Sequence, residues 1–114
     1  MRKVKIKGKI CLLKFGLYPN NTVAIECYHD EKRWLVATVN WESNFEGENY
    51  AETFQLPFVV IKNYSENEGV FEELLSAGVI SIGPYLSGSA GTVQVGKLTK
   101  KWQKIARKDL ENIK

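Results

Sequence analysis

The sequence predicts an α+β fold, a mainly antiparallel sheet of about five or six strands with two helices packed on one face. Strand-type alternation of apolar and polar residues dominates the first third of the chain. Two amphipathic helical patterns follow, one at residues 66–77 and one at 99–114. With 114 residues, 44% of them hydrophobic, the chain can build one core, so we expect a single domain over residues 1–114.

The first strand is expected at residues 3–12, where lysines alternate with apolar residues. One face would be wet and carry Lys3, Lys5, Lys7 and Lys9. The other face would be buried and carry Val4, Ile6, Ile10 and Leu12. Residues 13–17 interrupt this alternation, and Gly16 predicts a bulge there.

Two further strands, at 22–28 and 33–41, continue an antiparallel meander through turns at 18–21 and 29–32. If Tyr18 opposes Asn21, Leu12 lies opposite Cys27 and the apolar faces of the strands coincide. In the third strand, alternation predicts that Leu35, Ala37, Val39 and Trp41 face inward and that Trp34, Val36 and Thr38 face outward.

The middle of the chain predicts a polar loop at 42–55, followed by a short buried strand at 58–61 that Pro57 introduces. Two more strands are expected at 79–83 and 92–98. The glycine-rich segment 83–91 between them would be a flexible connection, since it lacks the lysine and the following helix of a phosphate-binding loop.

The predicted helix at 66–77 has both a start and a stop signal. Ser65 stands three residues before Glu68, which is the spacing of a capping box. Gly78 follows the last helical residue and would end the helix in a left-handed conformation. Gly69 is unusual, because glycine in a first turn costs about 1 kcal/mol relative to alanine, and a close backbone approach would explain it. One apolar stripe consists of Val70, Phe71, Leu74 and Leu75.

The second helix, at 99–114, has Thr99 as its expected N-cap. Its buried face would consist of Trp102, Ile105, Ala106, Leu110 and Ile113. Five basic residues surround that face: Lys100, Lys101, Lys104, Arg107 and Lys108.

The sequence contains little that indicates catalysis or metal binding. Cys11, Cys27 and His29 could supply three zinc ligands, but a fourth is missing, so buried thiols in a reducing compartment are the preferred interpretation. His29 lies beside Asp30 in a predicted turn and is expected to be solvated. No apolar run approaches the roughly 20 residues of a membrane helix. We therefore expect a cytoplasmic protein without enzyme activity, cofactor, metal or membrane partner.

A candidate protein-contact surface lies at the start of the first helix. Capping accounts for Ser65 and Glu68 but gives no role to the polar residues around them, for which a structural role is the preferred interpretation and contact with a partner the alternative. Residues 42–73 also hold eight glutamates against one lysine, so this part of the chain is acidic. The candidate contact surface for a protein partner consists of Asn63, Tyr64, Asn67, Glu68, Glu46 and Glu48.

Nucleic-acid binding is the alternative function, because both ends of the chain are basic. Residues 1–20 hold six basic and no acidic side chains, and Tyr28 and Trp34 could stack bases beside the lysines. Lysines on an edge strand also prevent aggregation, so the pattern has a structural explanation too. The candidate nucleic-acid surface consists of Lys3, Lys5, Lys7, Lys9, Trp34, Lys101, Lys104, Arg107 and Lys108.

The segment VVIKNYSENEGVFEELLSAGVI, preceded by ATVNW and followed by TVQVGKL, resembles a family of small bacterial and phage proteins. That family has a core of the form IK-N/D-YSENEG…L…AG-I/V, occurs in gut bacteria and mobile elements, and has no established activity. The resemblance covers roughly residues 35–98. It implies a non-enzymatic accessory protein of a phage or conjugative element that acts through protein–protein contacts.

Overall fold

The computed structural model describes residues 2–19, 22–39, 56–88 and 91–111, and it confirms the predicted α+β class. The strands are β1 (Lys3–Ile6), β2 (Lys9–Leu17), β3 (Val23–His29), β4 (Lys32–Val36), β5 (Phe58–Ile61), β6 (Ile80–Gly88) and β7 (Gly91–Leu98). The helical elements are the 3₁₀ turn η1 (Ser65–Asn67) and the α-helices α2 (Val70–Ser76) and α3 (Lys100–Glu111).

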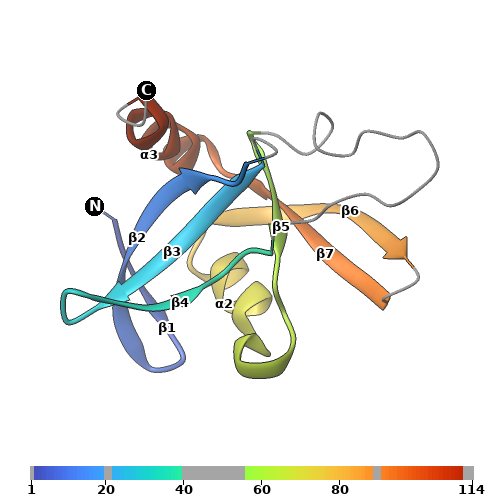
Figure 1. Cartoon of the computed structure of the whole chain (residues 1–114), viewed down its shortest axis with the longest axis horizontal. Helices are drawn as coiled ribbons and strands as arrows, with labels where there is room; N and C mark the ends of the chain where they lie inside the picture. Colours follow the sequence, from blue (N-terminus) through green and yellow to red (C-terminus); the bar gives the residue numbers. More distant parts are fainter. Residues whose placement is uncertain (1, 20–21, 40–55, 89–90, 112–114) are drawn as a thin grey trace.

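The strands form two antiparallel sheets, whereas the sequence suggested a single sheet. The first sheet has the order β1-β2-β3-β4 and the second the order β5-β7-β6. The segment after β4 links them: Thr38 forms a bridge with Ile61, and the amide of Val39 donates to the carbonyl of Val60 at 3.1 Å. Figure 1 shows the two sheets meeting near β5, with α2 and α3 on opposite sides of the view.

The segment predicted as the first strand is a hairpin. Lys7 and Gly8 form its two-residue turn, with φ of 51° and 80°, and positive φ at both central residues is what a tight right-twisted hairpin requires. Because the turn reverses the chain, Cys11 faces inward and Ile10 is 56% exposed. The predicted inward positions of Ile10 and Leu12 are therefore wrong.

The register between β2 and β3 differs by one residue from the prediction. Leu13, and not Leu12, lies opposite Cys27. β2 pairs regularly through Gly16, so the predicted bulge is also wrong. Once the hairpin is placed at residues 7–8, alternation continues unbroken, and Leu13 and Phe15 are buried beside β3.

The third predicted strand ends early: β4 stops at Val36, and the amide of Ala37 makes one more bond to β3, to the carbonyl of Ile25 at 2.8 Å. Thr38 was expected to face outward but is 3% exposed. Its Oγ1 accepts a hydrogen bond from the amide of Ile25 at 3.1 Å and lies 3.1 Å from the hydroxyl of Tyr18. The side chain thus satisfies a strand amide while the backbone crosses to β5. The predicted core residue Trp41 lies outside the described residues.

The glycine-rich segment predicted as a flexible connection instead belongs mostly to the β6–β7 hairpin. The pairing is interrupted between Ile82 and Tyr85, where a bulge accommodates Pro84, which has no amide to donate. A Cβ on Gly83 would lie 2.6 Å from the carbonyl oxygen of Val95. Only glycine allows the two backbones to approach so closely.

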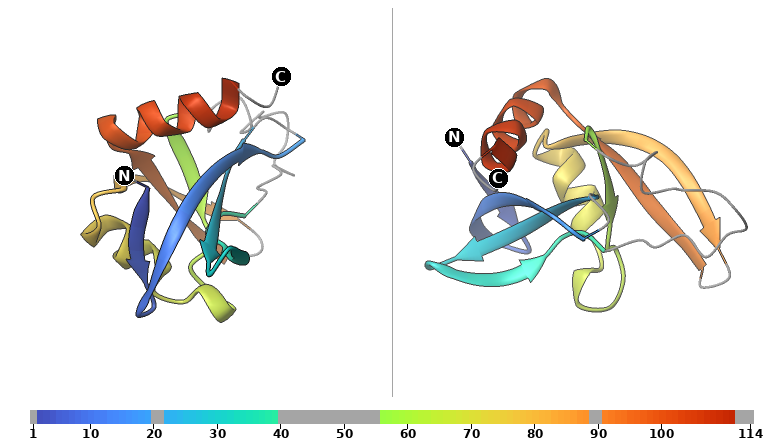
Figure 2. Two further views of the ribbon diagram at one scale, coloured as in Figure 1. Left: turned by 90° about the vertical axis from the view of Figure 1, so that its left-hand side faces the viewer. Right: turned by 45° about the horizontal axis from the view of Figure 1, so that its top comes forward.

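The core lies between the two sheets and the two helices. α2 packs against β1 and β6, and α3 packs against β2 and β7 (Figure 2). The most deeply buried side chains include Ile6, Leu13, Ile25, Ile61, Leu74, Leu98 and Trp102. No helix among the described residues is long and apolar enough to cross a membrane.

The position of α3 agrees with its prediction, and Trp102 and Ala106 are buried as expected. Thr99 precedes the helix, and its carbonyl accepts the amide of Gln103 at 2.8 Å. However, its hydroxyl donates to the carbonyl of Gly78 at 2.7 Å, so it ties the helix start to the end of α2.

An ion pair anchors the last turn of α3 to the N-terminal hairpin. Asp109 binds both guanidinium nitrogens of Arg2, at 2.5 and 2.7 Å, and accepts the amide of Phe15 at 3.0 Å. No residue of β1 lies beside that amide, because β1 begins at Lys3, which pairs with Leu12 of β2. Burial alone would raise the pKa of Asp109, but the hydrogen bonds from Arg2 and Phe15 outweigh it and lower this pKa.

Candidate contact surface around η1 and α2

Asn63, one of the predicted contact residues, caps α2. Its Oδ1 accepts hydrogen bonds from the amides of Gly69 and Phe71, both at 3.0 Å. Phe71 lies in the first turn of α2, where amides have no partner within the helix. Asn63 therefore satisfies these amides from the strand side of the turn, and its role is structural.

The capping box predicted for Ser65 and Glu68 is wrong. α2 begins at Val70, so the helix is shorter than predicted, and Gly69 occupies its N-cap position with φ of 92°. Ser65 lies in η1 with φ of 54°, and the amide of Glu68 donates to its carbonyl oxygen at 3.2 Å instead of to its hydroxyl. A Cβ on Gly69 would meet no atom within 4 Å, so close backbone approach does not explain this glycine; its positive φ does.

Asn67, another predicted contact residue, is only 1% exposed. Its Nδ2 donates to the carbonyl of Val36 at 2.6 Å, which ties η1 to the end of β4. Its Oδ1 is buried without a hydrogen-bond partner among the described residues. Asn67 is therefore not available for contact with a partner, in contrast to the prediction.

Tyr64 and Glu68 remain exposed beside these two asparagines. Tyr64 is 48% exposed, and the Nζ of Lys62 lies 5.5 Å from the centre of its ring. Lys62 also forms a 2.5 Å ion pair with Glu66, whose hydrogen bond raises the pKa of Lys62 and lowers that of Glu66. The predicted contact residues Glu46 and Glu48 lie outside the described residues.

An aromatic depression of about 430 Å³ lies between β4 and the η1 turn. This aromatic depression is lined by neighbouring aliphatic side chains and by Tyr18, Trp34, Val36, Lys62, Tyr64 and Glu66. It unites Tyr64 and Trp34, which the sequence had placed on different candidate surfaces. Tyr18 and Lys62 were not predicted as site residues. No local sequence pattern indicates them, because only the crossing from β4 to β5 brings them beside Trp34 and Tyr64.

The four N-terminal lysines do not form one free face. Lys3 and Lys5 are exposed on β1. Lys7 lies in the hairpin turn, where its amide donates to both carboxylate oxygens of Glu73 and its Nζ donates to the carbonyl of Glu66 at 2.7 Å. The predicted lysine face is thus divided by the hairpin turn.

The outer face of the four-stranded sheet nevertheless carries several basic side chains, although Glu26 also lies there and forms an ion pair with Arg33 at 3.0 Å. Lys3 pairs across the strands with Leu12, which pairs with Tyr28, which pairs with Arg33. The Nζ of Lys14 lies 4.5 Å from the ring centre of Tyr28.

Trp34 does not join this basic face as the sequence suggested. The bulge between Cys27 and Tyr28 places Arg33, and not Trp34, opposite Tyr28. Trp34 is half-buried against the core, and the Nζ of Lys9 lies 4.7 Å from its ring centre.

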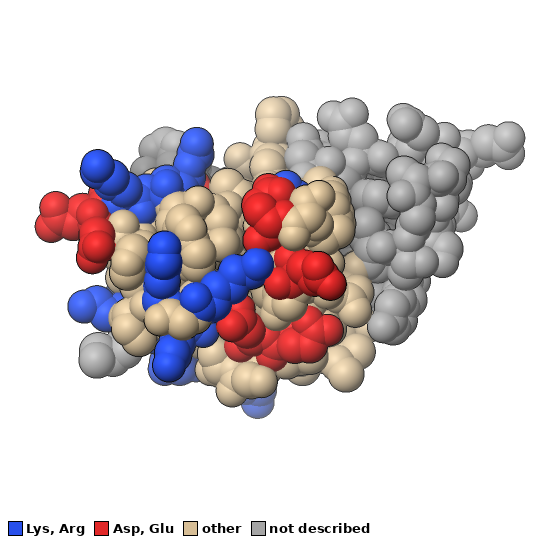
Figure 3. Space-filling model, turned by 90° about the horizontal axis from the view of Figure 1, so that it is seen from below, with Lys and Arg blue, Asp and Glu red and all other residues tan. Residues whose placement is uncertain are grey.

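The basic residues predicted on the second helix, Lys101, Lys104, Arg107 and Lys108, are all exposed on α3. The end of this helix reaches the sheet, because Asp109 lines a hollow together with Arg2 and Lys14. On the face seen in Figure 3, acidic side chains gather around α2 and η1 and most basic ones lie over the four-stranded sheet, with a second acidic group beside them at the left edge.

The chemistry of the thiols and the histidine is restrained by burial and hydrogen bonding. Cys11 and Cys27 are free and buried, and burial raises the pKa of Cys27 to about 12. His29 is less solvated than predicted: its Nδ1 lies 3.0 Å from the carbonyl oxygen of Ile10 and its Nε2 3.4 Å from Asp30. No group of three or more metal-ligating side chains occurs within the described part of the chain.

No protein-family model, no curated protein and no solved structure matches this chain. The resemblance of the YSENEG segment to a family of small phage and bacterial proteins therefore stays a prediction.

Proposed function

We propose that this protein is a small, non-enzymatic accessory protein that binds a protein partner through the aromatic depression. The observation that carries the proposal is that Tyr64 and Trp34 line one hollow whose rim also holds the Lys62–Glu66 ion pair. Aromatic side chains in half-open pockets are the usual anchors of protein interfaces. An apolar or aromatic side chain of the partner would fill the hollow, with basic residues beside it facing Glu66 and Glu68.

The hydrogen bonds that anchor the η1 turn support this proposal. The side chains of Asn63 and Asn67 bond to the backbone at the start of α2 and at the end of β4. These bonds would hold Tyr64 in place in the absence of a partner. A preordered surface loses less conformational entropy on binding than a flexible one. The asparagines would therefore act on recognition indirectly, by positioning Tyr64.

The resemblance suggests the biological setting of this proposal. A family core found in phages and mobile elements would make the protein an accessory factor of such an element, acting on a protein of its host or its own particle. Two free, buried thiols suit a reducing cytoplasm, where disulfides do not persist.

The proposal is tested with a displayed library of random peptides of about twelve residues, panned against the purified protein. We expect enrichment of peptides with an aromatic or large apolar anchor. Tyr64→Ala should weaken the selected peptides by about 30-fold, equivalent to about 2 kcal/mol, without changing the thermal midpoint.

The matched control is Ile82→Ala, which truncates another exposed side chain, 71% exposed on β6. It should leave the affinity unchanged. Failure to enrich any peptide, or binding that survives Tyr64→Ala, would overturn the proposal.

Nucleic-acid binding is a second candidate function, which the basic outer face of the four-stranded sheet favours. Lys3, Lys14 and Arg33 surround Tyr28 there, in the arrangement of a stacking platform. A salt series with single-stranded DNA and RNA tests it, since phosphate contacts make affinity fall steeply with salt. Lys14→Ala should lower the salt slope by about one. Absence of binding at low salt would remove this candidate.

A further inference from the structure

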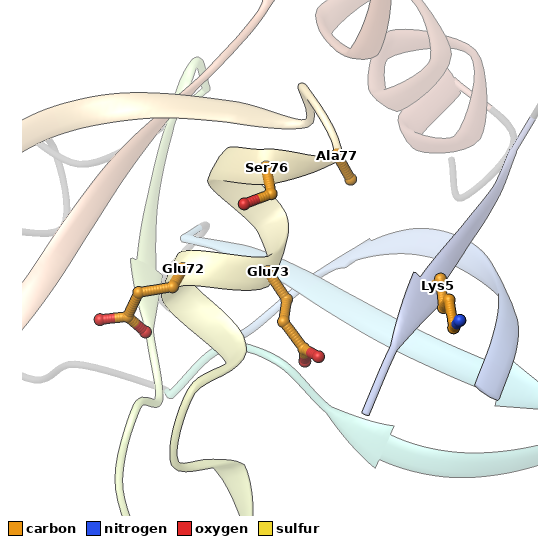
Figure 4. A pocket seen from close by; sticks show the side chains of 5 residues that line it. All are labelled: Lys5, Glu72, Glu73, Ser76 and Ala77. Carbon is orange, nitrogen blue, oxygen red and sulfur yellow. The ribbon is translucent and has the colours of Figure 1, made fainter. Parts of the chain in front are cut away.

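We propose that the groove between β1 and α2 is a second binding site, which accepts an extended segment of a partner protein as an added strand beside β1. The groove has a volume of about 440 Å³ and is lined by Lys5, Glu72, Glu73, Ser76 and Ala77. Figure 4 shows the α2 side chains of this groove and Lys5 across from them on β1. None of these residues lines the aromatic depression, so the two sites are independent.

The free edge of β1 carries the proposal. β1 is the outermost strand of its sheet. The amide of Leu13 donates to the carbonyl of Arg2 at 3.1 Å, which makes these two residues a hydrogen-bonded pair. Because such pairs alternate with unbonded pairs in an antiparallel ladder, Lys3 and Lys5 direct their amides and carbonyls away from β2. No described residue bonds to these groups, which are the groups that an added strand requires.

Contacts at the hairpin turn close one end of the groove. The carboxylate of Glu73 accepts the amide of Lys7 at 2.8 and 3.0 Å. These bonds join the turn to α2 and occupy the edge beyond Lys5. The open edge therefore extends from Lys5 toward the start of β1, and it suits a short segment.

Charge complementarity specifies the occupant. Successive side chains of an added strand point to opposite faces of the sheet. Those on the outer face would meet Lys3 and Lys5, and those on the inner side would meet Glu72 and the small residues of α2. The groove thus fits an extended segment with acidic residues at alternate positions and basic or small residues between them. A second copy of β1 does not fit, because antiparallel pairing around Val4 would place Lys3 opposite Lys5.

The test uses an acetylated and amidated peptide of about eight residues, in which glutamate alternates with arginine or serine. Its binding is followed by fluorescence anisotropy at low salt. Methylation of the peptide nitrogens that face β1 should weaken binding at least tenfold, because each removes a donor to the edge. Methylation of the alternate nitrogens should leave binding within twofold. A peptide of the same composition in scrambled order should bind at least tenfold more weakly.

Variants of the protein locate the site. Lys5→Pro removes an outward amide without disturbing the pairing with β2, and Ser76→Tyr fills the groove; each should weaken the alternating peptide at least tenfold. Ser81→Tyr makes the same change at an exposed serine of β6 and should have no effect. Tyr64→Ala should also have no effect, which separates this site from the aromatic depression.

Several results would overturn the inference. They are absence of binding, equal binding of the two methylated peptides, and equal binding of the scrambled peptide, which would show charge attraction alone. A dimer that sedimentation equilibrium detects and that Lys5→Pro dissociates would instead assign the edge to a second copy of the chain.

Discussion

α2 and α3 are both amphipathic helices for which the sequence predicted a hydroxyl residue as the N-cap, yet different forces hold them. α3 has 12 residues and begins where its pattern predicts. α2 has 7 residues and begins later than its pattern predicts, at a glycine with positive φ. In neither helix does the hydroxyl of the predicted residue, Ser65 or Thr99, act as the cap.

The difference shows how far a helix depends on the rest of the molecule. A helix of two turns is unstable in isolation, because its few hydrogen bonds do not offset the unfavourable free energy of nucleation. α2 therefore relies on Asn63 for its first amides and on the core for Val70, Phe71 and Leu74. α3 has a longer apolar face and one anchoring ion pair, so single changes should affect it less.

The largest expected effect is on the packing of α2. Leu74→Ala should lower the free energy of unfolding by about 3 kcal/mol, because a fully buried side chain leaves a cavity. Ile105→Ala, at a half-buried position of α3, should cost about 1 kcal/mol. Urea unfolding measures both values. Equal losses would show that the two helices depend on the core to the same degree.

The anchor of α3 is expected to contribute less and to depend on pH. Asp109→Ala should cost about 2 kcal/mol at pH 7, since it removes both bonds to Arg2 and leaves the amide of Phe15 without an acceptor. Because folding lowers the pKa of Asp109, its contribution is present above the unfolded pKa, near 3.9, and is lost as pH falls through the folded pKa. The difference between wild type and variant should therefore shrink below about pH 4 in unfolding curves. A difference that stays constant down to pH 2 would contradict this account.

Variants at the start of α2 distinguish the predicted cap, Ser65, from the observed cap, Asn63. Asn63→Ala should lower the free energy of unfolding by about 1.5 kcal/mol, because the amides of Gly69 and Phe71 lose their acceptor. Hydrogen exchange at the amide of Phe71 should accelerate. Ser65→Ala should change stability by less than about 0.5 kcal/mol, because the amide of Glu68 bonds to the backbone carbonyl of residue 65, which alanine keeps. A larger loss of stability for Ser65→Ala than for Asn63→Ala would show that the predicted capping box exists.

Gly69 provides the smallest and most specific test of the α2 start. Gly69→Ala should cost about 1 kcal/mol, because alanine is strained at φ of 92° even with open space around its Cβ. Gly16 has equal space but no positive φ, so Gly16→Ala should be neutral or slightly stabilising. Thermal unfolding of the two variants compares them directly. An equal effect would mean that backbone conformation does not set the start of α2.

Part of the candidate site was predictable from local pattern. Tyr64 and Glu68 are exposed as expected for polar residues at a junction. Asn63 and Asn67 looked equally free, but their partners lie on another element or further along the turn, at Val36, Gly69 and Phe71. Sequence spacing contains no signal for such bonds. The meeting of Tyr64 with Trp34 likewise depends on the crossing from β4 to β5.

The sequence by itself determined the α+β class, the apolar stripe of α2, the stop at Gly78 and most of α3, because these features follow from periodicity and from residues within a few positions of each other. Tertiary structure alone decided the division into two sheets, the register of β2 and the cap from Asn63. A hairpin turn at residues 7–8 inverts every later side chain of its strand, and only packing against β3 and the core selects between the two faces.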